Sequence, residues 1–371
     1  MTNTEADGRV GSLDVFKGLG IFFIAVLHLA IVARSGMGGT PPVVQALYLG
    51  LMGFFIMSGY FFRPGRGFKG NMGRRFRILF LALIVSAIAL PIICCAWCYV
   101  WGQPTGLEDL IDCMARTFAV ERSFVDFDGK VPWAICGFSM GYYFLWTMMG
   151  SFVIFYAIAD RIRDNLKLGL IVIAILVCIT AAYRELCDFT LPFYMNLWPI
   201  SAAFMVCGMY LSKYDLVKKV EAGSVRDPRW WGLFLGCAAC LLVMVYVFSP
   251  GITFDLMHFG DYGGYSAFPY MIEGVLAFVM IVYLSFFISK IPLVSTVFKK
   301  LGKHTMGILL LHVFIAKMAL APFFTFDDVN CITADLSGTP RIVFAFAVLI
   351  ASYLVCAYGP ALVKKLRGRD Q

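Results

Sequence analysis

Three ionisable side chains stand in the first apolar stretch of the chain, which reads DVFKGLGIFFIAVLHLA over residues 14–30. They are Asp14, Lys17 and His28, and His28 lies deep inside the apolar run. Such groups are costly inside a membrane unless they face a cavity or a partner, so each is a candidate for a functional site. A histidine with its ordinary pKa of about 6.5 can act there as a general base or as a nucleophile.

The spacing of these residues predicts one polar stripe on a helix. Lys17 and His28 are almost three helical turns apart, which places them on the same face and about 16 Å from each other along the axis. Asp14 lies one turn before Lys17 and is expected to pair with it. Two alternatives stay open: Lys17 as an anchor that reaches the membrane surface, and His28 as a hydrogen-bonding residue between helices.

Ionisable residues recur in two later apolar segments. Glu273 lies in FPYMIEGVLAF, and we expect it to orient His28 or to pair with Lys17; a protonated carboxyl packed against a neighbouring helix is the alternative. His312 lies in a segment that also contains Lys317. For His312 the alternative is an interhelical hydrogen bond. The position of Lys317 is explained by a side chain long enough to reach the membrane surface.

The elements that must position these residues are membrane helices. Of the 371 residues, 60% are hydrophobic and 15% are charged, whereas about a quarter of a typical soluble domain is charged. The apolar residues come in blocks of about twenty, the length that crosses a bilayer. We therefore predict an all-α integral membrane protein, one domain over 1–371 that forms a polytopic bundle of about ten transmembrane helices. The predicted spans are 15–34, 42–63, 78–101, 134–159, 168–183, 190–212, 231–249, 267–289, 305–323 and 341–362.

The distribution of charge predicts the orientation. The linker 63–77 carries six basic residues and no acid, whereas the linker 102–131 is acidic, and this alternation holds along the chain. Basic linkers stay in the cytoplasm, so both termini, 1–12 and the basic tail 363–371, are predicted there. The net charge of +8 then reports topology and attraction to lipid head groups, and no nucleic-acid partner is expected.

Two smaller features complete this part of the prediction. The segment TGLEDLIDCMARTFAV, within 102–131, has the spacing of a short amphipathic helix on the outer surface. The twelve cysteines lie mostly in predicted spans, so neither a disulfide framework nor a metal site is expected.

Four stretches, in order, resemble the membrane acyltransferase 3 family. DVFKGLGIFFIAVLH is similar to its opening motif, in which ten residues separate a basic residue from a histidine, here Lys17 and His28. Many members have arginine first; the lysine is similar to the fucose 4-O-acetylase-like branch, whose motif runs D-x-x-K-G. GFFIMSGYFF (53–62) and GYYFLWTMM (141–149) resemble its aromatic segments, the second with altered order around Trp146. LGKHTMGILLLH (301–312) is similar to its late element, with Thr305 and His312 at matching positions.

The resemblance implies a membrane O-acyltransferase in the bacterial cytoplasmic membrane. Its co-substrate would be acetyl-CoA, or another acyl-CoA, on the cytoplasmic side, and its acceptor a hydroxyl of a cell-envelope glycan or glycolipid; no permanently bound cofactor is implied. His28 would be the base or the acyl carrier, with Glu273 and His312 in the catalytic set. A separate partner protein of envelope assembly is compatible with this scheme. The residues expected to bind donor or substrate are Asp14, Lys17, Ser58, Tyr60, Arg74, Arg75, Arg77, Trp146 and Thr305.

Other interpretations stay open beside this one. The cluster of Arg74, Arg75 and Arg77 is also explained by the excess of basic residues in cytoplasmic linkers alone. The segment from Ser58 to Tyr60 is also explained by close helix packing at Gly59. A transporter or flippase for an envelope lipid or sugar would be expected to carry several intramembrane acids, and only Glu273 is deep. A polysaccharide polymerase would be expected to carry a large arginine-rich outer loop, and the loop 102–131 is net acidic. The acceptor sugar and the acyl chain length stay open.

Overall fold

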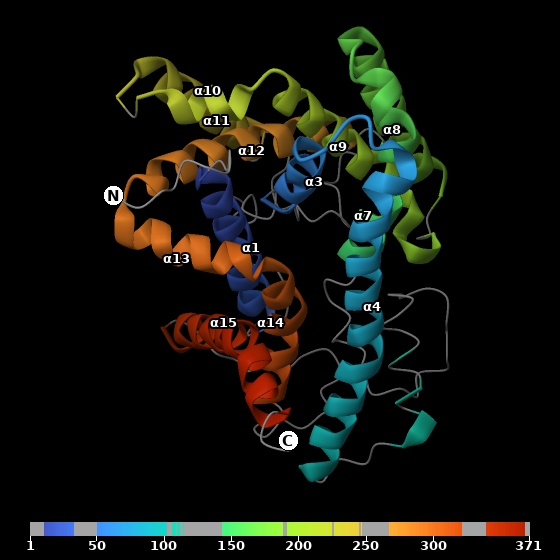
Figure 1. Ribbon diagram of the computed structural model, residues 1–371, viewed down its shortest axis with the longest axis vertical. Coiled ribbons are helices and arrows are strands. Elements are labelled where there is room, and N and C mark those ends of the chain that lie inside the picture. Colours follow the sequence, from blue (N-terminus) through green and yellow to red (C-terminus); the bar gives the residue numbers. More distant parts are fainter. Residues whose placement is uncertain are drawn as a thin grey trace.

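The computed structural model describes residues 11–32, 50–101, 143–187, 191–224, 226–244, 267–320 and 339–367, with a few residues between 106 and 114 and Tyr246. Within these ranges all regular structure is helical (Figure 1). The helices are α1 (Gly11–Val32), α3 (Gly50–Tyr60), α4 (Gly67–Val100), α7 (Tyr143–Ile162), α8 (Leu166–Leu186), η3 (Pro192–Leu197), α9 (Trp198–Lys213), α10 (Leu216–Ala222), α11 (Pro228–Val243), α12 (Ala267–Ser289), α13 (Pro292–Lys303), α14 (Thr305–Leu320) and α15 (Thr339–Arg367).

The all-α membrane class is confirmed. Each of the ten predicted spans overlaps a helix of the structure, and the described residues include six helices long and apolar enough to cross a membrane. The number of crossings and the cytoplasmic placement of the termini stay predictions. Of the predicted outer amphipathic helix in 102–131, the structure describes only residues 106–108, 110, 111 and 114, and all of these except 106 are helical. The six long apolar helices are Gly67–Trp97, Tyr143–Ile162, Leu166–Leu186, Phe193–Lys213, Ala267–Ser289 and Ile342–Ala361.

Two helices, α10 and α13, lie in segments that were expected to be linkers between spans. The basic segment after α12 was expected to be a linker, but it forms α13, which begins with a proline at its first turn and ends with Lys300 and Lys303. Its leucine, valine and phenylalanine residues recur at helical spacing, and one face packs against α1. On the other face, Leu293 and Val297 are exposed. The prediction looked for apolar blocks of about twenty residues, and α13 has only 12 residues, three of them lysines.

The short helix α3 lies at the centre of the packing and crosses α9 closely. A Cβ atom at Gly59 would meet the carbonyl of Met205, and one at Gly208 would meet the carbonyl of Ile56. Small residues at a crossing let two membrane helices approach until their backbones touch. The close-packing interpretation of Gly59 is therefore confirmed.

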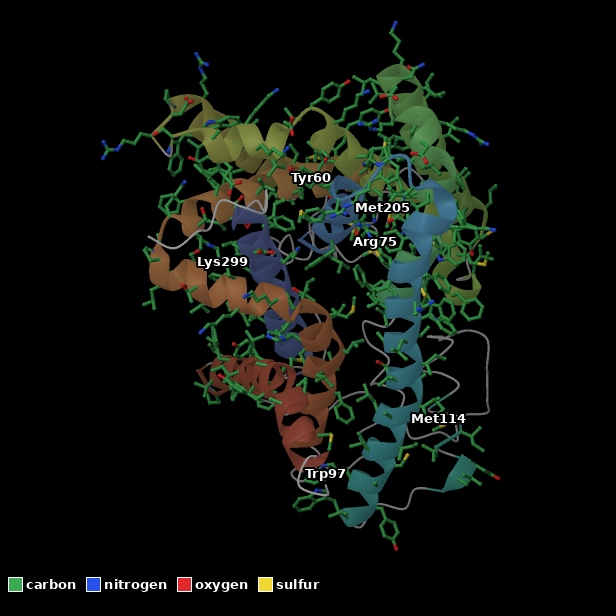
Figure 2. The ribbon with its side chains drawn as sticks, viewed as in Figure 1. Tyr60, Arg75, Trp97, Met114, Met205 and Lys299 are labelled. Atoms are coloured by element: carbon green, nitrogen blue, oxygen red, sulfur yellow. The ribbon has the colours of Figure 1, made fainter. Side chains whose placement is uncertain are left out.

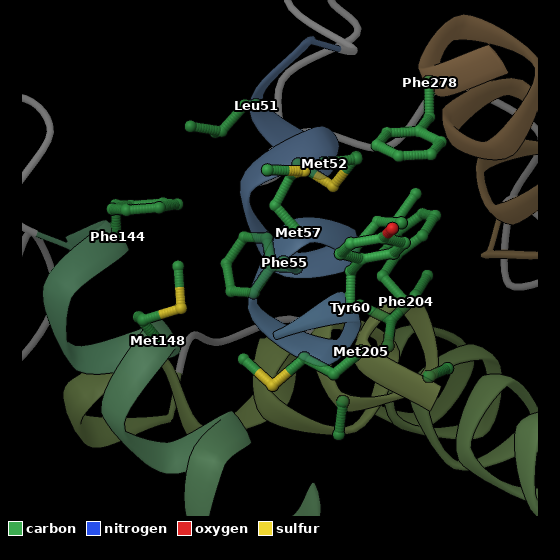
Figure 3. Close-up of a cluster of buried hydrophobic side chains, with 14 of the residues drawn as sticks. Leu51, Met52, Phe55, Met57, Tyr60, Phe144, Met148, Phe204, Met205 and Phe278 are labelled. Atoms are coloured by element: carbon green, nitrogen blue, oxygen red, sulfur yellow. The ribbon is translucent and has the colours of Figure 1, made fainter. Parts of the chain in front are cut away.

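Large apolar side chains surround α3 on its other sides (Figure 3). The ring of Phe55 packs edge-on against Phe144 of α7, with centroids 5.1 Å apart. Phe16 of α1 lies against Gly53 and makes a similar contact, at 5.2 Å, with Phe278 of α12. These contacts hold α1, α7 and α12 around α3.

Hydrogen bonds fix the ends of several helices. The hydroxyl of Tyr210 donates to the carbonyl of Ile162 at the end of α7, at 2.6 Å. Lys213 donates to a carboxylate oxygen of Asp164 at 3.0 Å, and this bond lowers the pKa of that carboxyl. At the start of α1, the backbone N–H of Ser12 donates to the carboxylate of Glu221 from α10, at 3.1 Å. Terminal backbone groups that no helix can satisfy are thus paired.

We expect Gly59→Ala to lower the free energy of unfolding by about 1–3 kcal/mol, the usual cost of overpacking, because the new methyl group would meet the carbonyl of Met205. Thermal unfolding in detergent measures this change. Gly236→Ala on α11 is the control, since a Cβ atom there meets no heavy atom within 4 Å. The control should be neutral or should stabilise by up to about 1 kcal/mol. Equal losses in both variants would contradict the close crossing.

Candidate functional site

A cavity of about 320 Å³ lies among α1, α3, α4, α7, α13 and α14. Its polar lining consists of Lys17, Ser58, Arg75, Lys303 and Thr305. Four of these were predicted to bind donor or substrate. The fifth, Lys303, was not, although it stands inside the motif LGKHT beside Thr305.

Two glycines bring Lys303 and Thr305 to Lys17. A Cβ atom at Gly18 would meet the backbone carbonyl of Phe298, and one at Gly302 would meet the carbonyl of Asp14. The first turns of α1 and the end of α13 are therefore in backbone contact. The residues that follow Gly302 consequently lie at the level of Lys17.

Lys17 is placed to bind an anion. Its ammonium nitrogen lies 3.5 Å from a carboxylate oxygen of Asp14, as predicted, and 5.2 Å from the centroid of the Phe61 ring. The Lys17 side chain keeps 30% of its surface exposed. An ammonium has three donors, so the contact with Asp14 leaves capacity for a ligand.

Arg75 has a different environment (Figure 2). Its guanidinium donates to the carbonyl oxygens of Ser58 (3.1 Å) and Phe61 (3.0 Å) at the end of α3, and to the hydroxyl of Tyr156 (2.8 Å) on α7. It also lies over the ring of Phe152. Cations near a helix C-terminus satisfy carbonyls and the helix dipole. Arg75 thus joins α4 to α3 and α7, a positioning role that its spacing in the sequence did not indicate.

The hydroxyl groups in the cavity both donate to backbone carbonyls. Ser58 donates to Phe54 at 2.8 Å, and Thr305 donates to Gly302 at 2.9 Å. Each oxygen keeps lone pairs that can accept a hydrogen bond. Thr305 is also the first residue of α14, whose terminal N–H groups favour an anion.

The cavity follows the face of α1 that carries the predicted stripe. Lys17, Ile21 and Ile24 all line it, at the spacing of one helix face. The helix is unbroken from Gly11 to Val32, so His28 lies on α1 one turn after Ile24. The side chain of His28 is outside the described residues, as are those of Arg74 and Lys317.

Glu273 lies elsewhere. It is buried on α12, with 2% of its surface exposed, and does not line the cavity. Its Oε1 atom has no hydrogen-bond partner among the described residues. Lys17 pairs with Asp14 on its own helix, and the described residues show no pairing of Glu273 with Lys17; orientation of His28 by Glu273 stays a prediction.

The other predicted residues are also outside the cavity lining. His312 is fully buried, and its Nδ1 atom lies 2.8 Å from the carbonyl of Ile308, one turn earlier on α14. Tyr60 packs edge-on against Phe61, and Trp146 packs against Phe193 with centroids 4.4 Å apart. Arg77 is exposed on α4.

Comparison with protein families gives one result. A family model described as an acyltransferase domain matches residues 10–359, nearly the whole chain. Comparisons with curated proteins and with solved structures find no match. The matched range includes the cavity and every residue that was predicted to act in catalysis or binding.

We expect Arg75→Ala to lower the free energy of unfolding by about 2–3 kcal/mol, because two backbone carbonyls and a hydroxyl lose a charged donor. Arg75→Lys should recover little, since an ammonium cannot reproduce the guanidinium fork. Denaturant titration in detergent gives the values.

Lys69→Ala is the matched control for Arg75, on an exposed turn of the same helix. Its change should stay within about 0.5 kcal/mol. A stable Arg75→Ala protein that had lost only donor binding would show that the guanidinium serves the ligand rather than α3.

Proposed function

Because this chain belongs to the membrane acyltransferase 3 family, we propose that it transfers an acyl group, acetyl in the simplest case, from an acyl-CoA to a hydroxyl of a cell-envelope or exported glycan. The coarser statement, a multi-pass membrane acyltransferase, follows from the family and the membrane helices. The observation that carries the finer proposal is the cavity, which joins a cationic end to the face of α1 on which His28 stands.

The cationic end suits the phosphates of an acyl-CoA. Lys17 and Lys303 line it from two helices, and the first turn of α14, which begins at Thr305, adds backbone N–H groups that have no acceptor within that helix. Hydrogen bonds between ammonium and phosphate groups are short and strong. By the predicted topology this end faces the cytoplasm, where acyl-CoA is present. The thin pantetheine arm would then extend along Ile21 and Ile24 toward His28.

Two routes of transfer are open to His28. As a base, its imidazole takes the proton from the acceptor hydroxyl while the oxygen attacks the thioester carbonyl; the carbon–sulfur bond breaks, and the thiolate leaves and takes up the proton. As a carrier, the imidazole attacks the thioester first and the acceptor hydroxyl then takes the acyl group from it. Both routes yield an ester and free CoA. The acceptor would be a glycan or glycolipid of the bacterial cytoplasmic membrane or beyond it, delivered with or without a partner protein.

Glu273 and His312 keep supporting roles in this proposal. Each is fully or almost fully buried in the bundle. Neither lines the cavity, so any effect of either residue on transfer would act through another residue.

His28→Ala should lower transfer of labelled acetyl groups from acetyl-CoA to the acceptor by about a hundredfold or more, the usual contribution of a positioned acid or base. Cell-surface O-acetyl content should fall with it at equal abundance of the protein in the membrane. Label retained on the wild-type protein without acceptor, and absent from His28→Ala, would identify the carrier route. An unchanged O-acetyl content would contradict the role of His28.

Lys303→Ala should raise the KM for acetyl-CoA about tenfold or more, because one charged hydrogen bond contributes about 1.5–3 kcal/mol, and should change kcat little. Lys300→Ala, also on α13 but exposed and outside the cavity lining, is the control. The effect of Lys303→Ala should shrink with a donor that lacks phosphate groups. Equal changes in the two lysine variants would contradict a specific contact.

A further inference from the structure

The cavity has two chemically different ends. Its cationic end is formed by Lys17, Lys303 and Thr305. Ser58 and Arg75 are the other polar residues of the lining. Among the described residues, the rest of the lining consists of hydrocarbon, ring and thioether side chains, and it includes Ile24, Leu51 and Phe144. Such a division fits a ligand with an anionic head and an apolar tail.

The apolar part is long enough for a chain of several methylene groups. On α1, the lining extends from Lys17 to Ile24, and on α3 it extends from Ser58 to Leu51. Each interval is seven residues, or about 10 Å at the rise of an α-helix. The lining on α1 and the lining on α3 therefore extend over the same length.

The apolar lining also suits a hydrocarbon chain. The backbone N–H and C=O groups inside a helix are already paired with each other. The two lining hydroxyls already have partners: Thr305 donates to the carbonyl of Gly302, and Ser58 donates to the carbonyl of Phe54 and contacts the sulfur of Met148. A hydrocarbon tail needs no hydrogen-bond partner beside Ile24 and Leu51, and the described side chains there offer none.

The cavity also opens toward lipid. Two of its lining residues, Phe61 and Ile78, are 42% and 52% exposed. Ile78 continues on α4 into the exposed residues Leu81 and Val85. The far ends of α4 and α14 are joined by the hydrogen bond from the Trp97 indole to the carbonyl of Met318, at 3.1 Å. The opening therefore lies at the opposite ends of α4 and α14, beside Lys17 and Lys303.

We propose that this cavity binds a fatty-acid carboxylate that enters from the membrane, with its head on Lys17 and Lys303 and its tail along Ile24, Leu51 and Phe144. The cavity holds one chain, since 320 Å³ is at the small end of ligand sites. A carboxylate is a compact anionic head that brings no further polar groups into the cavity. Because this ligand and the acyl donor use the same lysines, membrane fatty acids inhibit the enzyme competitively.

Binding can be measured without any acceptor, in nanodiscs of neutral phosphatidylcholine. The probe is cis-parinarate, a fluorescent fatty acid, displaced by butyrate, octanoate or dodecanoate. Affinity should rise about fourfold per methylene until the tail exceeds the cavity, and dodecanol should displace the probe at least tenfold less well than dodecanoate. No saturable binding of the probe, or equal displacement by the alcohol and the acid, would overturn the proposal.

Two substitutions test the two ends separately. Lys303→Ala should weaken dodecanoate about tenfold and leave dodecanol unchanged. Met148→Trp should fill the apolar part, so that affinity stops rising at a shorter chain, while Met148→Ala should move that limit to a longer one. Val153→Trp is the control: it lies on the same helix, is 41% exposed and does not line the cavity, so its chain-length series should match the wild type. Identical series in Met148→Trp and Met148→Ala would overturn the placement of the tail.

The outcome is separable from the proposed function. Acetyl transfer that dodecanoate does not inhibit would refute this inference and leave the acyltransferase proposal intact. Saturable fatty-acid binding without any turnover of acyl-CoA would refute the proposed function and leave the binding site intact.

Discussion

Backbone contact between α1 and α13 determines the geometry of the site. Gly18 and Gly302 lack the Cβ atoms that would push the two helices apart, so the carbonyls of Phe298 and Asp14 come directly against them. In a membrane, where apolar side chains gain little by leaving lipid, such close packing is a main source of helix association. The same contact holds the end of α13 against the start of α1, so Lys303 and Thr305 line the same cavity as Lys17. The cationic end of the cavity is thus a product of helix packing.

The polar residues around this site divide into those that hold the helices and those that stay available. Arg75 satisfies carbonyls at the end of α3, where α3 would otherwise leave unpaired acceptors. The described hydrogen bonds include none from Lys17 or Lys303 to a backbone carbonyl, and both lysines line the cavity. Basic residues near the membrane surface thus serve at least two purposes here, holding a helix end and lining the cavity, and their charge alone does not tell which residue does which.

Long apolar runs made the helices predictable, because a bilayer imposes both length and composition on a span. The pair of Asp14 and Lys17 was predictable for a similar reason, since residues one turn apart are neighbours on any helix. Helix α13 was missed because it is short and rich in lysine, and Lys303 was missed with it. The position of Glu273 outside the cavity lining could not be predicted, because separation in sequence carries no information on which helix faces meet. The role of Arg75 depends on the end of a different helix, which no local pattern encodes.

The contact between Ser12 and Glu221 gives the connection between α9 and α11 an unexpected importance. Connections of this kind are ordinarily the places where insertions, tags and exchanges between relatives are tolerated. Here Glu221 of α10 accepts a hydrogen bond from a backbone N–H in the first turn of α1, a group that α1 itself cannot pair. A chimaera that replaces this connection would remove the partner of that N–H group and so weaken the start of the helix that carries Lys17, although no residue of the cavity itself would have been changed.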